Sequence, residues 1–210
     1  MPFKTILFDL DGVLVDACEW HYEALNIALE EILSIKISRY QHKNMFNGLP
    51  TRKKLQILGL KPELIETINT RKQEITSKII DEKCVPDKKH LQLLSRLADE
   101  GFKIGCVSNS IRSSIVRMLE ATDQLYYMDF IVSNESVLQN KPFPDCYNFA
   151  MNRLGSDPGH TIIVEDSDVG LKSAYASDAK YVWKVNDATE VNIKNYERFL
   201  KDENIDPDGW

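Results

Sequence analysis

The stretch FDLDGVLVD (Phe8–Asp16) organises the rest of the chain. It overlaps the apolar segment KTILF (residues 4–8), whose length and composition are those of a short buried strand. Asp9 and Asp11 therefore lie just beyond the carboxyl end of a strand, where an unpaired buried charge is costly. Because ligands of open α/β sheets bind outside these strand ends, we interpret the two carboxylates as part of a functional site.

The second part of the chain alternates between strand and helix patterns. This alternation predicts an α/β fold with a doubly wound parallel sheet and helices on both of its faces. Amphipathic or apolar segments predict the elements in chain order: helix 91–101, strand 103–108, helix 111–121, strand 130–133, helix 145–154, strand 161–165, helix 169–177 and strand 180–185. The tail from about Thr189 carries no motif to which we assign a role.

Between the first strand and this alternating region, the sequence shows helical patterns only. One helix is expected over 17–33 and another over 62–81, with a loop at 47–50 marked by glycine and proline. We therefore expect two domains. An α/β catalytic core comprises residues 1–15 and 87–210, and a small helical domain comprising residues 16–86 is inserted after the first strand.

Composition and charge narrow the class of protein. The chain has 210 residues, 43% hydrophobic and 28% charged, with a formal net charge of −6. This acidity disfavours binding to nucleic acid or to an anionic membrane, and no segment approaches the ~20 apolar residues of a membrane span. The N-terminal segment does not resemble a signal peptide, and the four cysteines form no CxxC pair. We expect a cytoplasmic protein with reduced thiols, most simply a monomer.

Residues with useful chemistry recur at the predicted strand ends. Ser108 ends the second strand, and Glu165 and Asp166 follow the fourth. Each group also has a local explanation: Asp11-Gly12 suits a turn, Ser108-Asn109 and the acids at 165–166 suit helix caps, and Lys141-Pro142 suits a surface loop. Their recurrence at one sheet edge is harder to explain locally than any single motif.

Taken together, these residues predict a phosphoryl-transfer site. The carboxylates of Asp9, Glu165 and Asp166 are hard oxygen ligands that suit Mg²⁺. Asp9 can attack phosphorus, while Asp11, two residues on, can protonate the leaving oxygen and then activate water. The hydroxyl of Ser108 and the charge of Lys141 can hold the phosphoryl oxygens.

Four segments in order, DLDGVLVD, VSNS, KPFPD and VEDSDVG, resemble the motifs of the haloacid dehalogenase superfamily. The resemblance implies a Rossmann-like core, Mg²⁺ as cofactor and an aspartyl-phosphate intermediate. By position, Asp9 resembles the nucleophile and Asp11 the acid and base, with Ser108 and Lys141 as phosphate holders. The implied metal ligands are Asp9, the carbonyl of Asp11 and Asp166, with Glu165 assisting. An acid at position 11 favours phosphate chemistry over dehalogenation.

The helical insert resembles the C1-type cap of the subgroup with β-phosphoglucomutase and small phosphosugar phosphatases. That resemblance places His21 and Lys72 at functional cap positions, and it puts Thr51, with Arg52 beside it, where the mutase has an arginine for a remote phosphate. Lys72 also shares one helical face with Ile68 and Ile75, so it either reaches past them to solvent or serves a site. The remaining candidates for substrate binding follow the second motif: Asn109, Ser110 and Arg112.

Four functions remain open on the sequence, the last of them a catalytically inactive binding protein, which the presence of every motif acid disfavours. The first is a Mg²⁺-dependent phosphatase acting on a small phosphorylated metabolite, with a sugar phosphate preferred. The second is a phosphomutase of the β-phosphoglucomutase type, which the missing arginine disfavours. The third is a receiver-like signalling module phosphorylated on aspartate, which the insert of about seventy residues disfavours.

Overall fold

The computed structural model describes residues 3–46, 48–206 and 209–210. At its centre lies a five-stranded sheet with all strand pairs parallel, in the order β3-β2-β1-β4-β5. The predicted α/β class with a Rossmann-like parallel sheet is therefore confirmed. The strands are β1 Phe3–Phe8, β2 Lys103–Val107, β3 Phe130–Val132, β4 Ser156–Glu165 and β5 Tyr181–Lys184.

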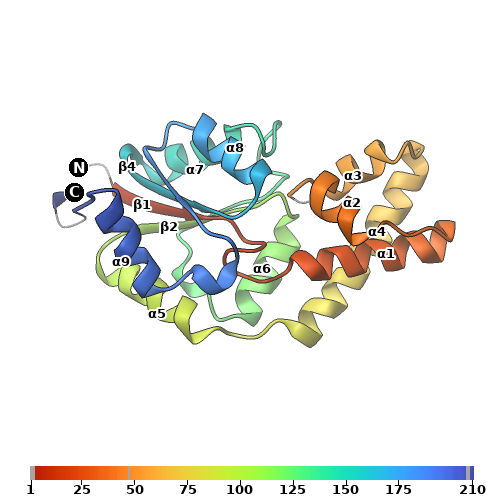
Figure 1. The fold of residues 1–210 in the computed structure, drawn as a ribbon, viewed down its shortest axis with the longest axis horizontal. Helices are drawn as coiled ribbons and strands as arrows, with labels where there is room; N and C mark the ends of the chain where they lie inside the picture. The colour runs from red at the N-terminus through yellow and green to blue at the C-terminus, as the bar shows by residue number, and fades with distance from the viewer. Residues whose placement is uncertain (1–2, 47, 207–208) are drawn as a thin grey trace.

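Helices cover both faces of the sheet, as the doubly wound pattern predicts (Figure 1). Side chains of β1 alternate between the faces: Ile6 and Phe8 belong to one hydrophobic cluster and Leu7 to the other. The first cluster includes side chains of α5 (Lys88–Asp99), α6 (Arg112–Ala121) and α9 (Ile193–Asp202), and the second includes side chains of α7 (Asp145–Leu154) and α8 (Asp168–Ala176).

The segment between β1 and α5 is helical and has a hydrophobic cluster of its own. We call residues 16–86 the cap; it projects beyond the sheet at the right of Figure 1. Its cluster includes the fully buried Leu29, Leu55 and Ile68. Asn47, in the predicted loop at 47–50, lies outside the described residues. The cap elements are α1 Cys18–Leu33, α2 Arg39–Gln41, η1 His42–Phe46, α3 Thr51–Ile57 and α4 Pro62–Lys83.

The tail beyond Thr189, to which the sequence assigned no role, packs on the sheet part. Tyr196 and Phe199 of α9 lie 6.0 and 5.7 Å from the ring of Trp183, measured between ring centroids. Trp210 stacks on Tyr181 at 5.7 Å. The tail therefore completes the core. No helix among the described residues combines the length and apolar composition that crossing a bilayer requires.

Candidate active site

A cavity of about 630 Å³ opens between the carboxyl ends of the strands and the cap. Its core wall contains Asp9, Asp11, Ser108 and Lys141, which the sequence predicted to meet. These residues are up to 132 positions apart in the chain, and the parallel topology brings them to one edge. The predicted cap residues His21, Thr51, Arg52 and Lys72 and the loop residues Asn109 and Ser110 also line it.

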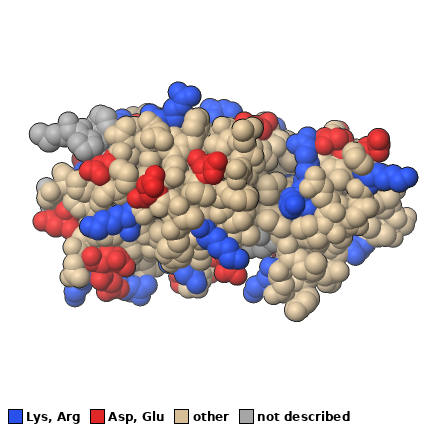
Figure 2. Space-filling view, turned by 90° about the horizontal axis from the view of Figure 1, so that it is seen from above, with Lys and Arg blue, Asp and Glu red and all other residues tan. Residues whose placement is uncertain are grey.

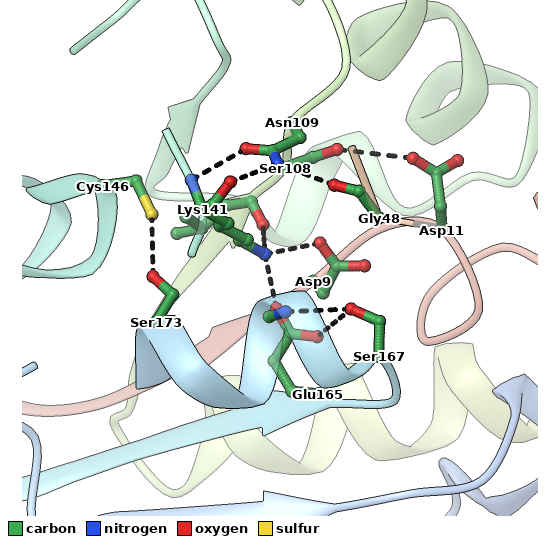
Figure 3. A network of polar contacts seen from close by, with 12 residues as sticks. Asp9, Asp11, Gly48, Ser108, Asn109, Lys141, Cys146, Glu165, Ser167 and Ser173 are labelled. Carbon is green, nitrogen blue, oxygen red and sulfur yellow. Dashed lines mark hydrogen bonds and ion pairs between the residues drawn. The ribbon is translucent and has the colours of Figure 1, made fainter. Parts of the chain in front are cut away.

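The ammonium of Lys141 lies at the centre of the core wall (Figure 3). Its Nζ atom donates to Asp9 Oδ1 and to Glu165 Oε1, each at 2.6 Å, and to the Val107 carbonyl at 2.7 Å. Burial alone would lower the pKa of Lys141, but the carboxylates of Asp9 and Glu165 hold that pKa above its usual range. Lys141 therefore remains a cation at physiological pH, placed to hold Asp9.

Glu165 is fully buried at the end of β4, and its carboxylate is held from several sides. Besides Lys141, the hydroxyl of Tyr147 donates to Glu165 Oε1 at 2.6 Å. The α8 residue Gly170 faces the same carboxylate so closely that a Cβ there would overlap with it. The glycine thus leaves the space that the carboxylate occupies.

Three carboxylates crowd together at this edge of the sheet. Oxygen atoms of Asp9, Glu165 and Asp166 lie within 4.8 Å of one another. Burial, followed for Asp166 by the charge of Glu165, raises the pKa of Asp9 well above its ordinary value and that of Asp166 to about 7. Such crowding is relieved by protons or by a cation.

The donor set fits a divalent cation. Asp166 Oδ1 is buried and has no hydrogen-bond partner among the residues that the structure describes, an arrangement that buried polar atoms rarely keep without a ligand. All three groups offer hard oxygen atoms, which Mg²⁺ prefers. Gly12, at φ +95°, lets the chain pass beside the Asp166 carboxylate, with which a Cβ at Gly12 would overlap. The site thus suits the cation that the sequence predicts.

Asp11 lies beside this cluster, with its carboxylate held by three side chains. His21 Nε2 is 2.8 Å from Oδ1, and the hydroxyls of Ser110 and Ser108 donate to Oδ2 at 2.9 and 3.4 Å. Burial would raise the pKa of Asp11, but the contacts with His21 and Ser110 bring it to about 2. Asp11 is therefore ionised before substrate binds.

His21 links Asp11 to the cap. Its Nδ1 atom lies 2.9 Å from Nζ of Lys72, which is only 5% exposed and therefore does not reach past its apolar neighbours to solvent. Burial and the nearby Lys72 lower the pKa of His21. A neutral imidazole that accepts from Lys72 at Nδ1 donates from Nε2 to Asp11. Burial lowers the pKa of Lys72 to about 7.

Asn109 fastens the core to the cap. Its amide nitrogen donates to the carbonyls of Gly48 at 2.7 Å and Lys141 at 3.1 Å, and its Oδ1 accepts from the Lys141 amide. Asn109 thus fixes the backbone that carries Lys141 and also touches the cap loop.

Two predicted basic residues are already paired. The guanidinium of Arg52 forms a bidentate pair with Glu66, at 2.7 and 2.8 Å, on the cap surface. Arg112 does not line the cavity; its Nη1 donates to the Ile131 carbonyl at 3.1 Å, and its backbone N–H donates to Glu135. The geometry therefore gives no support to Arg112 as a substrate ligand.

Four buried residues of the site were not predicted from the sequence: His42, Lys54, Asn69 and Tyr147. Lys54 lies three residues beyond Thr51, on the same helical face, and this spacing was a usable signal. His42 and Tyr147 carried no comparable signal, because their roles depend on contacts made by the tertiary fold.

Known proteins resemble this chain in sequence and in fold. The sequence profile of the haloacid dehalogenase-like hydrolase family matches residues 6–184. Pyrophosphatase PpaX of Bacillus pumilus is 27% identical, over 84% of this chain and 81% of that protein. Beta-phosphoglucomutase of Bacillus subtilis is 28% identical, over 81% of this chain and 78% of that protein. The crystal structure of beta-phosphoglucomutase from Clostridium difficile has a TM-score of 0.79 at 20% identity and covers 96% of this chain and 98% of its own.

Proposed function

The chain belongs to the haloacid dehalogenase-like hydrolase family, and we propose that it is a Mg²⁺-dependent phosphatase for a small phosphorylated metabolite, in the first place a sugar phosphate. One observation supports this most directly. Asp9 and Asp11 face the same cavity, Lys141 contacts Asp9, and Asp166 Oδ1 nearby has no hydrogen-bond partner among the described residues. A nucleophile, an acid and base, and a cation site are the parts that hydrolysis through an aspartyl-phosphate requires.

In the first step, a carboxylate oxygen of Asp9 attacks phosphorus and the bond from phosphorus to the ester oxygen breaks. Lys141 holds Asp9 and offers its charge to the phosphoryl oxygens, and the Ser108 hydroxyl faces the same cavity. Mg²⁺, held by Asp9, Asp166 and the Asp11 carbonyl with Glu165 assisting, would neutralise these crowded charges and polarise the phosphoryl group.

Asp11 supplies the proton transfers. It gives a proton to the departing ester oxygen, and then takes a proton from the water that attacks phosphorus, which frees phosphate and restores Asp9. In the free protein Asp11 is ionised, with its pKa near 2. A phosphate dianion beside Asp11 raises that pKa, because a neighbouring negative charge disfavours the carboxylate, and Asp11 takes up from solvent the proton that it then donates.

The cap has a separate task. It covers the cavity opposite the reacting groups and contributes His21 and Lys72 to its wall. Closure over substrate would exclude bulk water during transfer, and opening would release the products.

Phosphate release from a panel of phosphorylated metabolites, with Mg²⁺ present, tests the proposal. The wild type should release phosphate from at least one sugar phosphate, and Asp9→Asn should release none while its circular dichroism spectrum stays unchanged. Comparable turnover by Asp9→Asn would contradict the nucleophile. No release from any monoester by the wild type would contradict the phosphatase.

A phosphomutase is the second candidate. It is favoured by the contact between Lys72 Nζ and His21 Nδ1, at 2.9 Å, in a cap that resembles the cap of the mutases. Incubation with β-glucose 1-phosphate, Mg²⁺ and a bisphosphate primer separates the two. Free phosphate as the product supports the phosphatase, and glucose 6-phosphate supports the mutase.

A further inference from the structure

Tyr147 of α7 is fully buried beside the site, and the proposed chemistry assigns it no role. Its hydroxyl donates to Glu165 Oε1 at 2.6 Å. Its ring lies against the ammonium of Lys141, with 4.8 Å between Nζ and the ring centroid. One side chain therefore contacts both partners of the ion pair that stands next to Asp9.

The oxygen Oε1 of Glu165 is shared by two donors. Lys141 Nζ donates to this atom at 2.6 Å, the same distance as the Tyr147 hydroxyl. The other oxygen, Oε2, accepts from the Ser167 hydroxyl at the longer distance of 3.4 Å. Short hydrogen bonds to an ionised group are the strong ones, so the place of the carboxylate depends on Tyr147 as well as on Lys141.

Lys141 divides its hydrogen bonds between a group that reacts and groups that do not. An ammonium has three N–H donors, and those of Lys141 go to Asp9 Oδ1, Glu165 Oε1 and the Val107 carbonyl. Asp9 loses its negative charge when its oxygen bonds to phosphorus, whereas Glu165 and Val107 stay as they are. The third N–H is then available to a phosphoryl oxygen, and the two lasting bonds aim it.

Burial makes the position of this ammonium important. On the face in Figure 2, Lys and Arg are interspersed with Asp and Glu, and solvent and salt screen these exposed charges. The side chains of Lys141 and Glu165 are only 3% and 0% exposed, so their attraction is screened far less. A Glu165 carboxylate without the hydroxyl would therefore draw the ammonium more strongly, away from Asp9.

We propose that Tyr147 is a positioning residue for phosphoryl transfer, which acts on Lys141 through Glu165. Its hydroxyl shares the charge of Glu165, so that Glu165 anchors the ammonium without drawing it away from Asp9 and the phosphoryl group. This inference rests on the proposed function, because that function assigns Lys141 to the phosphoryl oxygens. Tyr147 does not line the cavity, so it acts on substrate only through these neighbours.

Tyr147→Phe keeps the ring and removes the hydroxyl. With p-nitrophenyl phosphate and saturating Mg²⁺, the single-turnover rate constant should fall by about 10- to 100-fold, while half-saturation by substrate stays within about 3-fold. This rate constant does not depend on the fraction of folded molecules, so partial misfolding cannot cause the loss. Tyr196→Phe deletes a buried hydroxyl without a hydrogen-bond partner among the described residues; as the matched control, it should change the rate constant by less than about 2-fold.

A double-mutant cycle shows whether Tyr147 acts through Glu165. The neutral amide of Glu165→Gln draws the ammonium of Lys141 less, so adding Tyr147→Phe to it should lower the rate constant by at most about 3-fold. An undiminished loss in this background would overturn the inference. Recovery of the Tyr147→Phe rate constant at higher Mg²⁺ concentration would overturn it as well, because the hydroxyl would then serve the metal rather than Lys141.

Beryllium trifluoride, which binds to an aspartate as a mimic of the phosphoryl group, measures the same effect without turnover. In calorimetric titrations with Mg²⁺ present, Tyr147→Phe should bind it about 10-fold or more weakly than the wild type, and Tyr196→Phe should match the wild type. A crystal structure of the wild type with this mimic should keep the Tyr147 hydroxyl on Glu165 Oε1. A hydroxyl turned away from Glu165 would overturn the inference even if Tyr147→Phe did not fold.

The outcomes separate the two proposals. An unchanged rate constant and unchanged affinity for beryllium trifluoride in Tyr147→Phe would overturn the positioning role and leave the phosphatase standing. No phosphate release from any monoester by the wild type, combined with weaker binding of beryllium trifluoride by Tyr147→Phe, would overturn the phosphatase and support the positioning role.

Discussion

Single residues in this cavity trade stability for chemistry, and Lys54 is a clear case. Burial lowers the pKa of Lys54 from its ordinary 10.5 to about 8, although Asp11 and Cys18 act in the opposite direction. The unfolded chain binds this proton more tightly than the folded one, so the charge of Lys54 disfavours folding at every pH below about 10. A side chain that costs stability and touches a cavity is typical of a functional site.

The lowered pKa of Lys54 predicts how the stability of the protein depends on pH. At pH 7 the free energy of unfolding of Lys54→Met should exceed that of the wild type by up to about 3 kcal/mol. This figure follows from the difference between the ordinary pKa of 10.5 and the folded-state pKa of about 8. The gap should be complete below about pH 8 and close as pH rises to about 10.5. Urea unfolding at pH 7 and pH 10.5 measures it. A variant less stable than the wild type at pH 7 would show that Lys54 supports the fold.

Asp11 gives a second prediction at this scale. Asp11→Asn should slow hydrolysis of alkyl phosphates by about 10²- to 10⁴-fold, because the leaving oxygen then departs without a proton. p-Nitrophenyl phosphate, whose leaving group needs no proton, should lose less in the transfer step. Single-turnover rates for both esters provide the comparison. Equal losses for the two leaving groups would argue against Asp11 as the acid.

Gly170 tests the space around Glu165. Gly170→Ala places a methyl group against the Glu165 carboxylate and should lower stability by about 1–3 kcal/mol and raise the Mg²⁺ concentration for half-maximal activity. Gly59→Ala is the control: its Cβ meets nothing within 4 Å, and only its positive φ of +75° adds strain. Activity measured against Mg²⁺ concentration should distinguish the two variants. Equal Mg²⁺ requirements would contradict the close contact between Gly170 and the Glu165 carboxylate.

The sequence predicted the residues that follow strand ends and failed where tertiary contacts decide. Asp9, Asp11 and Ser108 lie at the predicted edge because strand topology places them there, whereas Lys141 lies nine residues beyond the end of β3 and its backbone is held there by Asn109. Lys54 sits in the segment TRKKLQ, which reads as a polar surface. Its burial depends on the cap folding over the cavity, which the polar composition of this segment does not reveal, and only the helical spacing from Thr51 points toward the site.

At the scale of elements, two helices carry fully buried tyrosines in different settings. Tyr147 of α7 donates to Glu165 at 2.6 Å, whereas the Tyr196 hydroxyl of α9 has no hydrogen-bond partner among the described residues. Tyr147→Phe should therefore cost about 1.5–3 kcal/mol, the range for a hydrogen bond to a charged group. Tyr196→Phe should be neutral or slightly stabilising. Chemical unfolding of both variants makes the comparison, and equal losses would contradict it.

Helix and strand patterns were most informative where they alternated. The strands expected at 103–108, 130–133, 161–165 and 180–185 correspond to β2–β5 within a few residues, except that β4 begins at Ser156, where it pairs with Phe3 across an irregularity in register. Helix α9 was missed although Tyr196, Phe199 and Leu200 repeat at helical spacing. The other residues of α9 are mostly polar, so its narrow apolar face, which packs on the sheet part, was not recognised.

At the scale of the whole molecule, the carboxylates proposed to hold Mg²⁺ all belong to the sheet part, so Mg²⁺ should stabilise it. At 100 times its Kd, Mg²⁺ should add about 2.7 kcal/mol and raise the Tm by about 5–10 °C. In Asp166→Asn this increment should largely vanish, while the variant without Mg²⁺ should be at least as stable as the wild type, because carboxylate crowding is relieved. Calorimetry with and without Mg²⁺ decides, and an unchanged increment in the variant would contradict the ligand set.

Removal of the metal should silence the enzyme. EDTA should abolish phosphate release, and added Mg²⁺ should restore it, because the crowded acids then again have a partner for their charge. Activity that persists after exhaustive dialysis against EDTA would contradict Mg²⁺ dependence.

The central strand, β1, has a consequence for how the chain is made. It leaves the ribosome before both of its partners, which are β2, from Lys103, and β4, from Ser156. Throughout that interval the nascent chain exposes an apolar edge with no neighbour, while the cap, whose contacts lie closer in sequence, can already collapse. A chaperone that shields emerging apolar segments should therefore matter most for this protein before translation reaches β4.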